Sequence, residues 1–232
     1  IIILTSGDLE IKASSDNNAR LIGGAVTVSS AKAGIGLNVA VIANNDTVTA
    51  AIGKDGNITV SDGNVNVTAQ SDFDAWSITV AAAVKTGGTG SGATIGGGLT
   101  VIVSDNEVLA MVGDNTKINT SGDVTIKADN DAYLLLVSAS VAADGSGGGG
   151  VAGGGTVAVI VTGNKAKALL GDSAEIISDG EVTIASYNIE KLISILASAS
   201  GASGTATSVA GTVNVLVSNS ESIAAVGDYA KI

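Results

Sequence analysis

The stretch VIANNDTVTAAIGKDGNI at residues 41–58 is the first of four related segments, which we call the cassette. The others read VIVSDNEVLAMVGDNTKI at 101–118, VIVTGNKAKALLGDSAEI at 159–176 and VLVSNSESIAAVGDYAKI at 215–232. Successive copies begin 60, 58 and 56 residues apart. A repeat of this length is typical of stacked supersecondary units rather than of a compact enzyme. The pattern predicts one continuous array, residues 1–232, with repeats at about 1–58, 59–118, 119–176 and 177–232.

A second repeated element, a turn followed by an alternating strand, precedes each cassette. It reads SGDLEIKA, DGNVNVTA, SGDVTIKA and DGEVTIAS around Gly7, Gly63, Gly122 and Gly180. Apolar residues at every second position indicate a half-buried strand, and Ser/Asp-Gly supplies the turn. We expect the first apolar residue of each strand and the isoleucine that ends each cassette to line the core: Val65, Val124, Val182, Ile58, Ile118 and Ile176.

The rest of each repeat predicts three more strands. A second apolar strand (for example 75–84) is followed by a glycine- and serine-rich stretch at 85–98 or 144–155, interpreted as a loop. A third strand enters the cassette, and a polar turn (44–46 and 104–106) separates it from a fourth. The fourth ends at a recurring glycine, expected where the backbone bends or where a Cβ has no space: Gly53, Gly113, Gly171 and Gly227.

The fold class that follows is all-β, a parallel β-solenoid (β-helix) built from four repeats of about 58 residues. One repeat forms either one rung or two to three smaller rungs, and a sandwich array is the alternative to a solenoid. If one repeat equals one rung, the alanines of the cassette stack in one column: Ala50, Ala110, Ala168 and Ala224.

Some strands are apolar on both faces. LLLVSASVAA at 134–143 and ITVAAAV at 78–84 are nearly continuous apolar runs, which are typical of strands buried on both sides. We therefore expect one wall of the solenoid to be covered, either by the glycine-rich loop or by a neighbouring chain.

Composition weighs against several functions. The net charge of −11 argues against binding nucleic acid or anionic membranes. Residues 192–220 carry no charge, but Ser, Thr, Gly and Asn interrupt them, so we expect no membrane insertion in this segment. There is no histidine for a nucleophilic triad. Most carboxylates follow turns, so the chain is not expected to be an enzyme.

No cofactor is expected. The glycine-rich segment GGTGSGATI at 87–95 has Gly92 where the calcium-binding nonapeptide requires Asp. The acidic clusters that remain as calcium candidates are Asp72 with Asp74 and Asp129 with Asp131, because calcium needs several oxygen ligands.

GTVAVIVTGNKAKALLGDSAEIISDGEVTIA at 155–185 resembles the repeat regions of giant secreted bacterial β-solenoid adhesins. These include filamentous-haemagglutinin-like proteins, autotransporter passengers and leukotoxin-type filamentous adhesins. The resemblance implies a structural shaft of an adhesin or surface fibre, extracellular or on the bacterial cell surface. Implied partners are flanking repeats or neighbouring copies of the same protein, self-assembling end to end or laterally, and a host surface or glycan. A carbohydrate-binding or polysaccharide-processing β-helix is the alternative.

Overall fold

The computed structural model describes residues 1–30, 32–87 and 91–232, and these residues form strands and turns without a helix. The strands are β1 (Ile2–Leu4), β2 (Leu9–Ser29), β3 (Ala33–Ile52), β4 (Asn57–Val60), β5 (Val65–Lys85), β6 (Ala93–Val112), β7 (Lys117–Thr120), β8 (Val124–Asp144), β9 (Val151–Thr162), β10 (Lys165–Leu170), β11 (Glu175–Ser178), β12 (Val182–Ala202), β13 (Thr207–Ser218) and β14 (Glu221–Val226).

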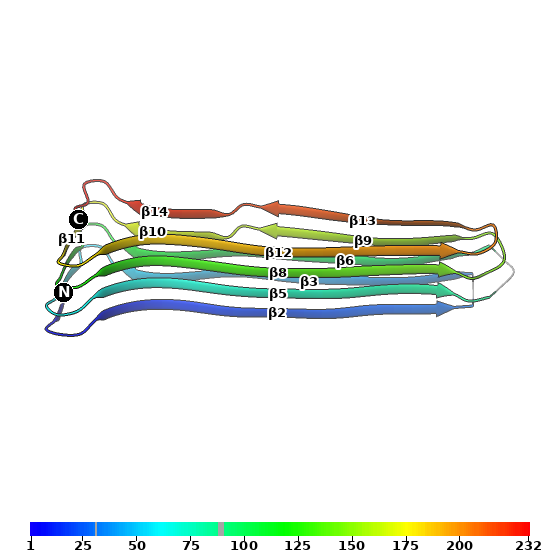
Figure 1. Ribbon diagram of the computed structural model, residues 1–232, viewed down its shortest axis with the longest axis horizontal. Coiled ribbons are helices and arrows are strands. Elements are labelled where there is room, and N and C mark those ends of the chain that lie inside the picture. Colours follow the sequence, from blue (N-terminus) through cyan, green and yellow to red (C-terminus); the bar gives the residue numbers. More distant parts are fainter. Residues whose placement is uncertain (31, 88–90) are drawn as a thin grey trace.

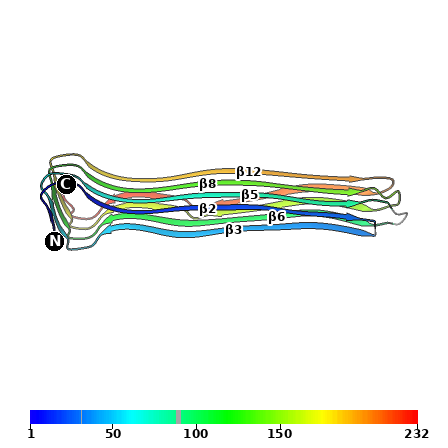
Figure 2. The same cartoon turned by 90° about the horizontal axis from the view of Figure 1, so that it is seen from below.

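The strands form three parallel sheets that wind into a solenoid (Figure 1). Sheet A contains the short strands β1, β4, β7 and β11. Sheet B contains β2, β5, β8 and β12, and sheet C contains β3, β6, β9 with β10, and β13 with β14. Sheets B and C run the length of the molecule, and both chain termini lie at the end where sheet A is found (Figures 1 and 2). We call that end the base and the opposite end the apex. The predicted fold class, a parallel β-solenoid, is confirmed.

Each repeat forms one rung, which is the first of the two arrangements considered above. Ala50 pairs with Ala110, Ala110 with Ala168, and Ala168 with Ala224. Each strand therefore hydrogen-bonds to its counterpart in the next repeat, and side chains of the same type lie in columns along the stack.

The strands are longer and fewer than the sequence indicates. The marker strand and the second strand are one strand of 21 residues in β2, β5, β8 and β12. The expected polar turns at 44–46 and 104–106 lie inside β3 and β6. Their polar residues alternate between the two faces of the sheet, so a polar interior position was mistaken for a turn. Only the third and fourth rungs break there, at 163–164 and 219–220.

The core of the basal half is aliphatic. One cluster joins all three sheets and includes Val65, Val124, Ile58, Ile118 and Ile176, each at most 3% exposed. Val182, in the fourth rung, packs against this cluster but is half-buried, because no further rung covers it within the structure. Burying a Val or Ile side chain stabilises a fold by about 1.5–3 kcal/mol, so this end supplies much of the folding energy.

The interior of the apical half is thin and contains small residues. Thr79 Oγ1 lies 3.1 Å from Thr100 Oγ1 and 2.9 Å from Ser138 Oγ, which joins sheets B and C. A Cβ on Gly96 would overlap the Val141 carbonyl, and one on Gly154 would lie 2.6 Å from the Ala199 carbonyl oxygen. The interpretation of the glycine-rich stretch as a loop is therefore wrong for residues 95–98 and 153–155, which lie within β6 and β9, whereas residues 145–150 lie between strands and residues 88–90 are outside the described part of the chain. Glycine lets the sheets approach closely.

Candidate functional site

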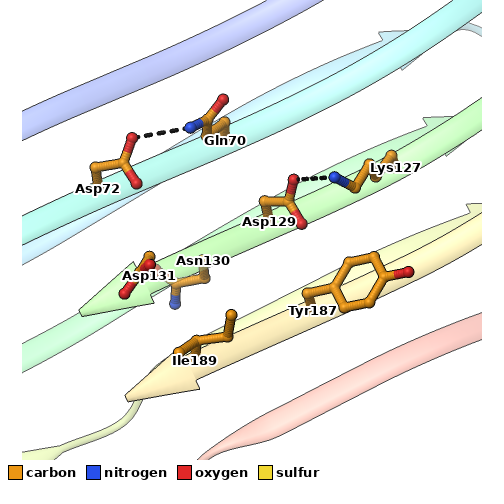
Figure 3. Close-up of a pocket in the computed structure, with 8 residues that line it drawn as sticks. All are labelled: Gln70, Asp72, Lys127, Asp129, Asn130, Asp131, Tyr187 and Ile189. Carbon is orange, nitrogen blue, oxygen red and sulfur yellow. Dashed lines mark hydrogen bonds and ion pairs between the residues drawn. The ribbon is translucent and has the colours of Figure 1, made fainter. Parts of the chain in front are cut away.

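A polar groove of about 350 Å³ lies on the outer face of sheet B, in its basal half (Figure 3). Strands β5, β8 and β12 each contribute side chains from alternate positions, because every second residue of a strand points outward. The outward lining residues are Gln70, Asp72, Lys127, Asp129, Asp131, Tyr187 and Ile189, and the buried Asn130 lies between Asp129 and Asp131 in the sequence.

Hydrogen bonds within single strands orient the polar groups of the groove. Gln70 Nε2 donates to Asp72 Oδ2 at 2.9 Å. Lys127 Nζ pairs with Asp129 Oδ2 at 2.6 Å and lies 5.2 Å from the ring centroid of Tyr187. The Tyr187 side chain is half exposed. The groove therefore offers oriented donors and acceptors beside an aromatic ring, a combination that suits a polar ligand with one apolar face.

All four calcium candidates lie on this outer face. Asp72 pairs with Asp131 in the next rung, and Asp16 in the first rung extends the same column. Asp74 lies beside Tyr133, and Asp129 lies beside Gln70. Among the residues that the structure describes, no group of three or more acidic side chains is placed to hold a metal ion. The four aspartates stay candidates from the sequence alone, and the expectation that the chain uses no cofactor stays a prediction.

A second polar arrangement, a ladder of side-chain to backbone hydrogen bonds, follows the turns of the base. The Asn64 N–H donates to Asp8 Oδ1, the Asp123 N–H to Asn64 Oδ1, and the Glu181 N–H to Asp123 Oδ1, each at 2.8 Å. The Asp172 N–H donates to Asp114 Oδ1 at 3.0 Å in the neighbouring turn. These carboxylates, interpreted from the sequence as solvated turn residues, connect successive rungs.

The recurring glycines lie directly before this second set of turn residues. An added Cβ would lie 2.6 Å from the backbone nitrogen of Lys54 at Gly113 and of Asp114 at Gly171. At Gly227 it would lie 2.7 Å from the backbone nitrogen of Asp172. Gly53, in the first rung, has open space around it, since the structure contains no rung below. Close stacking of rungs therefore explains three of these glycines.

An ion pair closes the apical end of the interior. Lys85 Nζ lies 3.8 Å from Asp144 Oδ1 and donates to Ser146 Oγ at 3.0 Å, and both charged side chains are at most 2% exposed. Ser146 donates to Asp144 Oδ1 through its hydroxyl and its backbone N–H. These hydrogen bonds from Ser146, with the nearby Lys85 ammonium, hold the pKa of Asp144 below its ordinary value despite burial. A Cβ at Gly92 would overlap Lys85 Nζ, so glycine leaves room for the pair.

Sequence reasoning missed the groove and the apical ion pair. Gln70, Lys127 and Tyr187 belong to different repeats, and only the one-rung register brings them together. Lys85 and Asp144 had a visible signal, because each is a lone charge at the end of an apolar strand and both occupy equivalent positions. Trp76 and Tyr133 lie on neighbouring strands but are offset by two residues: Trp76 pairs with Leu135, and the ring centroids are 6.4 Å apart.

Comparison with protein-family models, curated proteins and solved structures found no match to this chain. Within the described residues, no helix has the length and apolar character needed to cross a membrane.

Proposed function

We propose that this chain is a structural shaft segment of an extracellular bacterial adhesin or surface fibre. The observation that carries the proposal is that the long strands of sheets B and C hydrogen-bond to strands of adjacent rungs, along one axis. Each rung therefore presents a template for the next, and length is obtained by adding rungs. The bacterial surface location is inferred from the resemblance of residues 155–185 to adhesin repeats.

The dimensions support a flat ribbon rather than a cylindrical rod. A strand of 21 residues spans about 70 Å at 3.3 Å per residue. Each rung adds about 4.8 Å along the stack. The width of the ribbon is thus fixed by the strand length, and its length by the number of rungs.

The proposed partners, flanking repeats or further copies of the chain, are supported by the edge strands of the stack. β2 and β12 are the edge strands of sheet B, and edge strands readily pair with further strands. Glu175 bridges to Lys231, so Ile232 follows the isoleucine column formed by Ile2, Ile58, Ile118 and Ile176. Flanking repeats, or copies added end to end, would continue the sheets in register.

The test is a tandem series of one, two and three copies, in which each added copy begins at Ile3 so that Ile232 takes the place of Ile2. Electron microscopy of the series should show the dimension along the stack growing by about 19 Å per copy. The width of about 70 Å should stay constant. Separate beads, or particles that widen with each copy, would contradict a continuous shaft.

The groove on sheet B favours a second candidate, a carbohydrate-binding or polysaccharide-processing β-helix. Tyr187 presents half of its surface beside Lys127, Asp129 and Gln70, and aromatic faces with adjacent hydrogen-bonding groups suit sugar rings. A glycan array probed with the chain and with Tyr187→Ala tests it. Binding by the parent chain that Tyr187→Ala abolishes would support this candidate, and binding by neither would remove it.

A further inference from the structure

The apical half of the molecule has its polarity reversed. Its interior contains Ser77, Thr79 and Thr100, each at most 1% exposed. Its outer surfaces carry valine, isoleucine and leucine, with Val39 66% exposed and Val41 56% exposed. The two sheets approach closely here, and the inward positions of these strands are taken mostly by alanine, serine, threonine and glycine, while valine, isoleucine and leucine occupy many of the outward positions. A surface of this kind on a soluble chain indicates an interaction site.

One part of this surface is the outer face of sheet C, which we call the apical C face. It is formed by the outward residues of 35–43, 95–103, 153–161 and 209–217. Two aliphatic columns run across all four rungs, Val39–Leu99–Val157–Val213 and Val41–Val101–Val159–Val215. Sheet B is less flat at the same level, because Trp76 projects there with Arg20 5.3 Å from its ring centroid.

We propose that the partner of the apical C face is the same face of a second copy of this chain. The columns form ribs that repeat once per rung, every 4.8 Å or so. A surface with the same rung spacing can place its own ribs between them along the whole stack, as facing sheets do in β-sandwiches. The inference goes beyond the shaft, whose growth runs along the stack axis, since this contact joins stacks side by side.

The area of the face suggests how strong the contact is. Nine residues of strand per rung give about 140 Å² per rung, or roughly 570 Å² for four rungs on each copy. The total of about 1,100 Å² lies near the lower bound for specific interfaces, so four rungs should associate weakly. The buried area grows with rung number, and the lateral affinity should rise with it.

Charge placement favours contact through the apical halves. The net charge is −11, and carboxylates such as Asp72, Asp131 and Asp172 lie in the basal half or at the base. The charged pair at the apex, Lys85 with Asp144, is buried and of opposite sign. Copies therefore repel one another at their bases and meet at their uncharged apical faces. Salt should screen the repulsion and strengthen the association.

Lipid is the competing partner, and the sheet edges argue against it. Within the described residues, β2 and β12 are edge strands whose outer N–H and C=O groups have no neighbouring strand. Water or a further rung can satisfy these groups, but hydrocarbon cannot, and open sheet edges are not found in the hydrocarbon region of bilayers.

Sedimentation velocity of the chain over a concentration series, at low and high salt, tests the proposal. The parent chain should shift from monomer to dimer, with tighter association at high salt. The paired substitution Val101→Lys with Val159→Lys should weaken association by at least about tenfold. Val101→Thr with Val159→Thr keeps the β-branched shape and should weaken it as well.

The matched control is Asn66→Lys with Thr125→Lys, which places two adjacent lysines on the outer basal face of sheet B. It should associate like the parent chain, and circular dichroism should show the same strand content in all variants. A parent chain that stays monomeric at every concentration, or lysine variants that associate normally, would overturn the proposal. So would flotation with phosphatidylcholine vesicles that is lost in the Val101 and Val159 variant, because the face would then bind lipid.

Discussion

At the residue scale, the glycine before the basal turn allows one rung to lie on the next. Gly171→Val would place Cβ 2.6 Å from the Asp114 backbone nitrogen, an overlap that backbone movement must relieve. We expect this variant to lose about 1–3 kcal/mol of unfolding free energy, measured by urea denaturation. Gly53→Val is the control, because no atom lies within 4 Å of its added Cβ. Equal stability of the two variants would contradict the stacking explanation.

The buried pair at the apex predicts how stability depends on pH. The native pKa of Asp144 lies below its ordinary value, so its stabilising contribution is complete above the unfolded pKa of about 3.9 and is lost as the pH falls through the native pKa. Thermal unfolding should thus show acid destabilisation below about pH 4. A hydrogen bond from Lys117 also lowers the pKa of Glu175, so protonation of Glu175 should further reduce the stability of the fold in acid.

A double variant separates the contribution of Asp144 to the pH dependence of stability from that of Glu175. Lys85→Met with Asp144→Leu replaces the pair by apolar side chains and should retain most of the stability at neutral pH, with a smaller loss on acidification. Asp144→Asn alone removes the carboxylate that faces the buried Lys85 ammonium and should destabilise the fold at neutral pH more than the double variant does. If the single and double variants are equally unstable, the pair has no role in the closure of the apex.

At the scale of the element, the inward face of each long strand is aliphatic in the basal half and contains small and polar residues in the apical half. A layer of buried polar side chains lies between the two halves. Asn164 Oδ1 accepts a hydrogen bond from the Ser104 hydroxyl at 3.0 Å. The backbone carbonyl oxygen of Asn164 accepts a hydrogen bond from Asn188 Nδ2 at 2.7 Å. The side chain of Asn130, also buried, has no partner among the residues that the structure describes. We expect Asn164→Val to destabilise the fold by about 1–3 kcal/mol, because the buried Ser104 hydroxyl loses its acceptor and keeps only the 3.4 Å hydrogen bond from Asn106 Nδ2. Asn130→Val should be neutral or stabilising. Calorimetry of both variants is the measurement, and the opposite ranking would contradict the description of this layer.

This polar layer also explains how far the fold could be predicted from the sequence. Alternation identified the strands and the inward positions of Val65 and Val124, because a two-residue period follows from backbone geometry alone. The same local pattern could not distinguish a polar interior position from a turn, so Asn106 was assigned to a turn and not to β6. A glycine in the sequence was equally ambiguous, because it can belong to a strand or to a turn. Gly96 lies in a strand and permits close sheet packing, whereas Gly87, with φ +84, lies outside the strands. The groove depends on register between repeats, which no single strand specifies.

At the scale of the whole molecule, stability should depend on the number of rungs, because the terminal rungs expose one side of every strand pair. Sheet B of the first rung alternates between half-buried and exposed residues, and β13 is exposed throughout, whereas β5 and β8 have fully buried inward faces. In stacked repeats, stability is approximately a sum of rung terms and interfaces between rungs.

A tandem chain of two copies joined in register, with Ile3 following Ile232, converts two terminal rungs into interior ones. We expect a single cooperative transition at a higher temperature than that of one copy, because the junction completes the burial of the half-buried inward residues of β2 and β12. The control inserts one glycine at the junction, which shifts the register by one residue and turns each inward side chain outward. It should unfold at the temperature of the single copy. If the two tandem chains have the same transition, rungs do not template their neighbours, and the shaft proposal loses its physical basis.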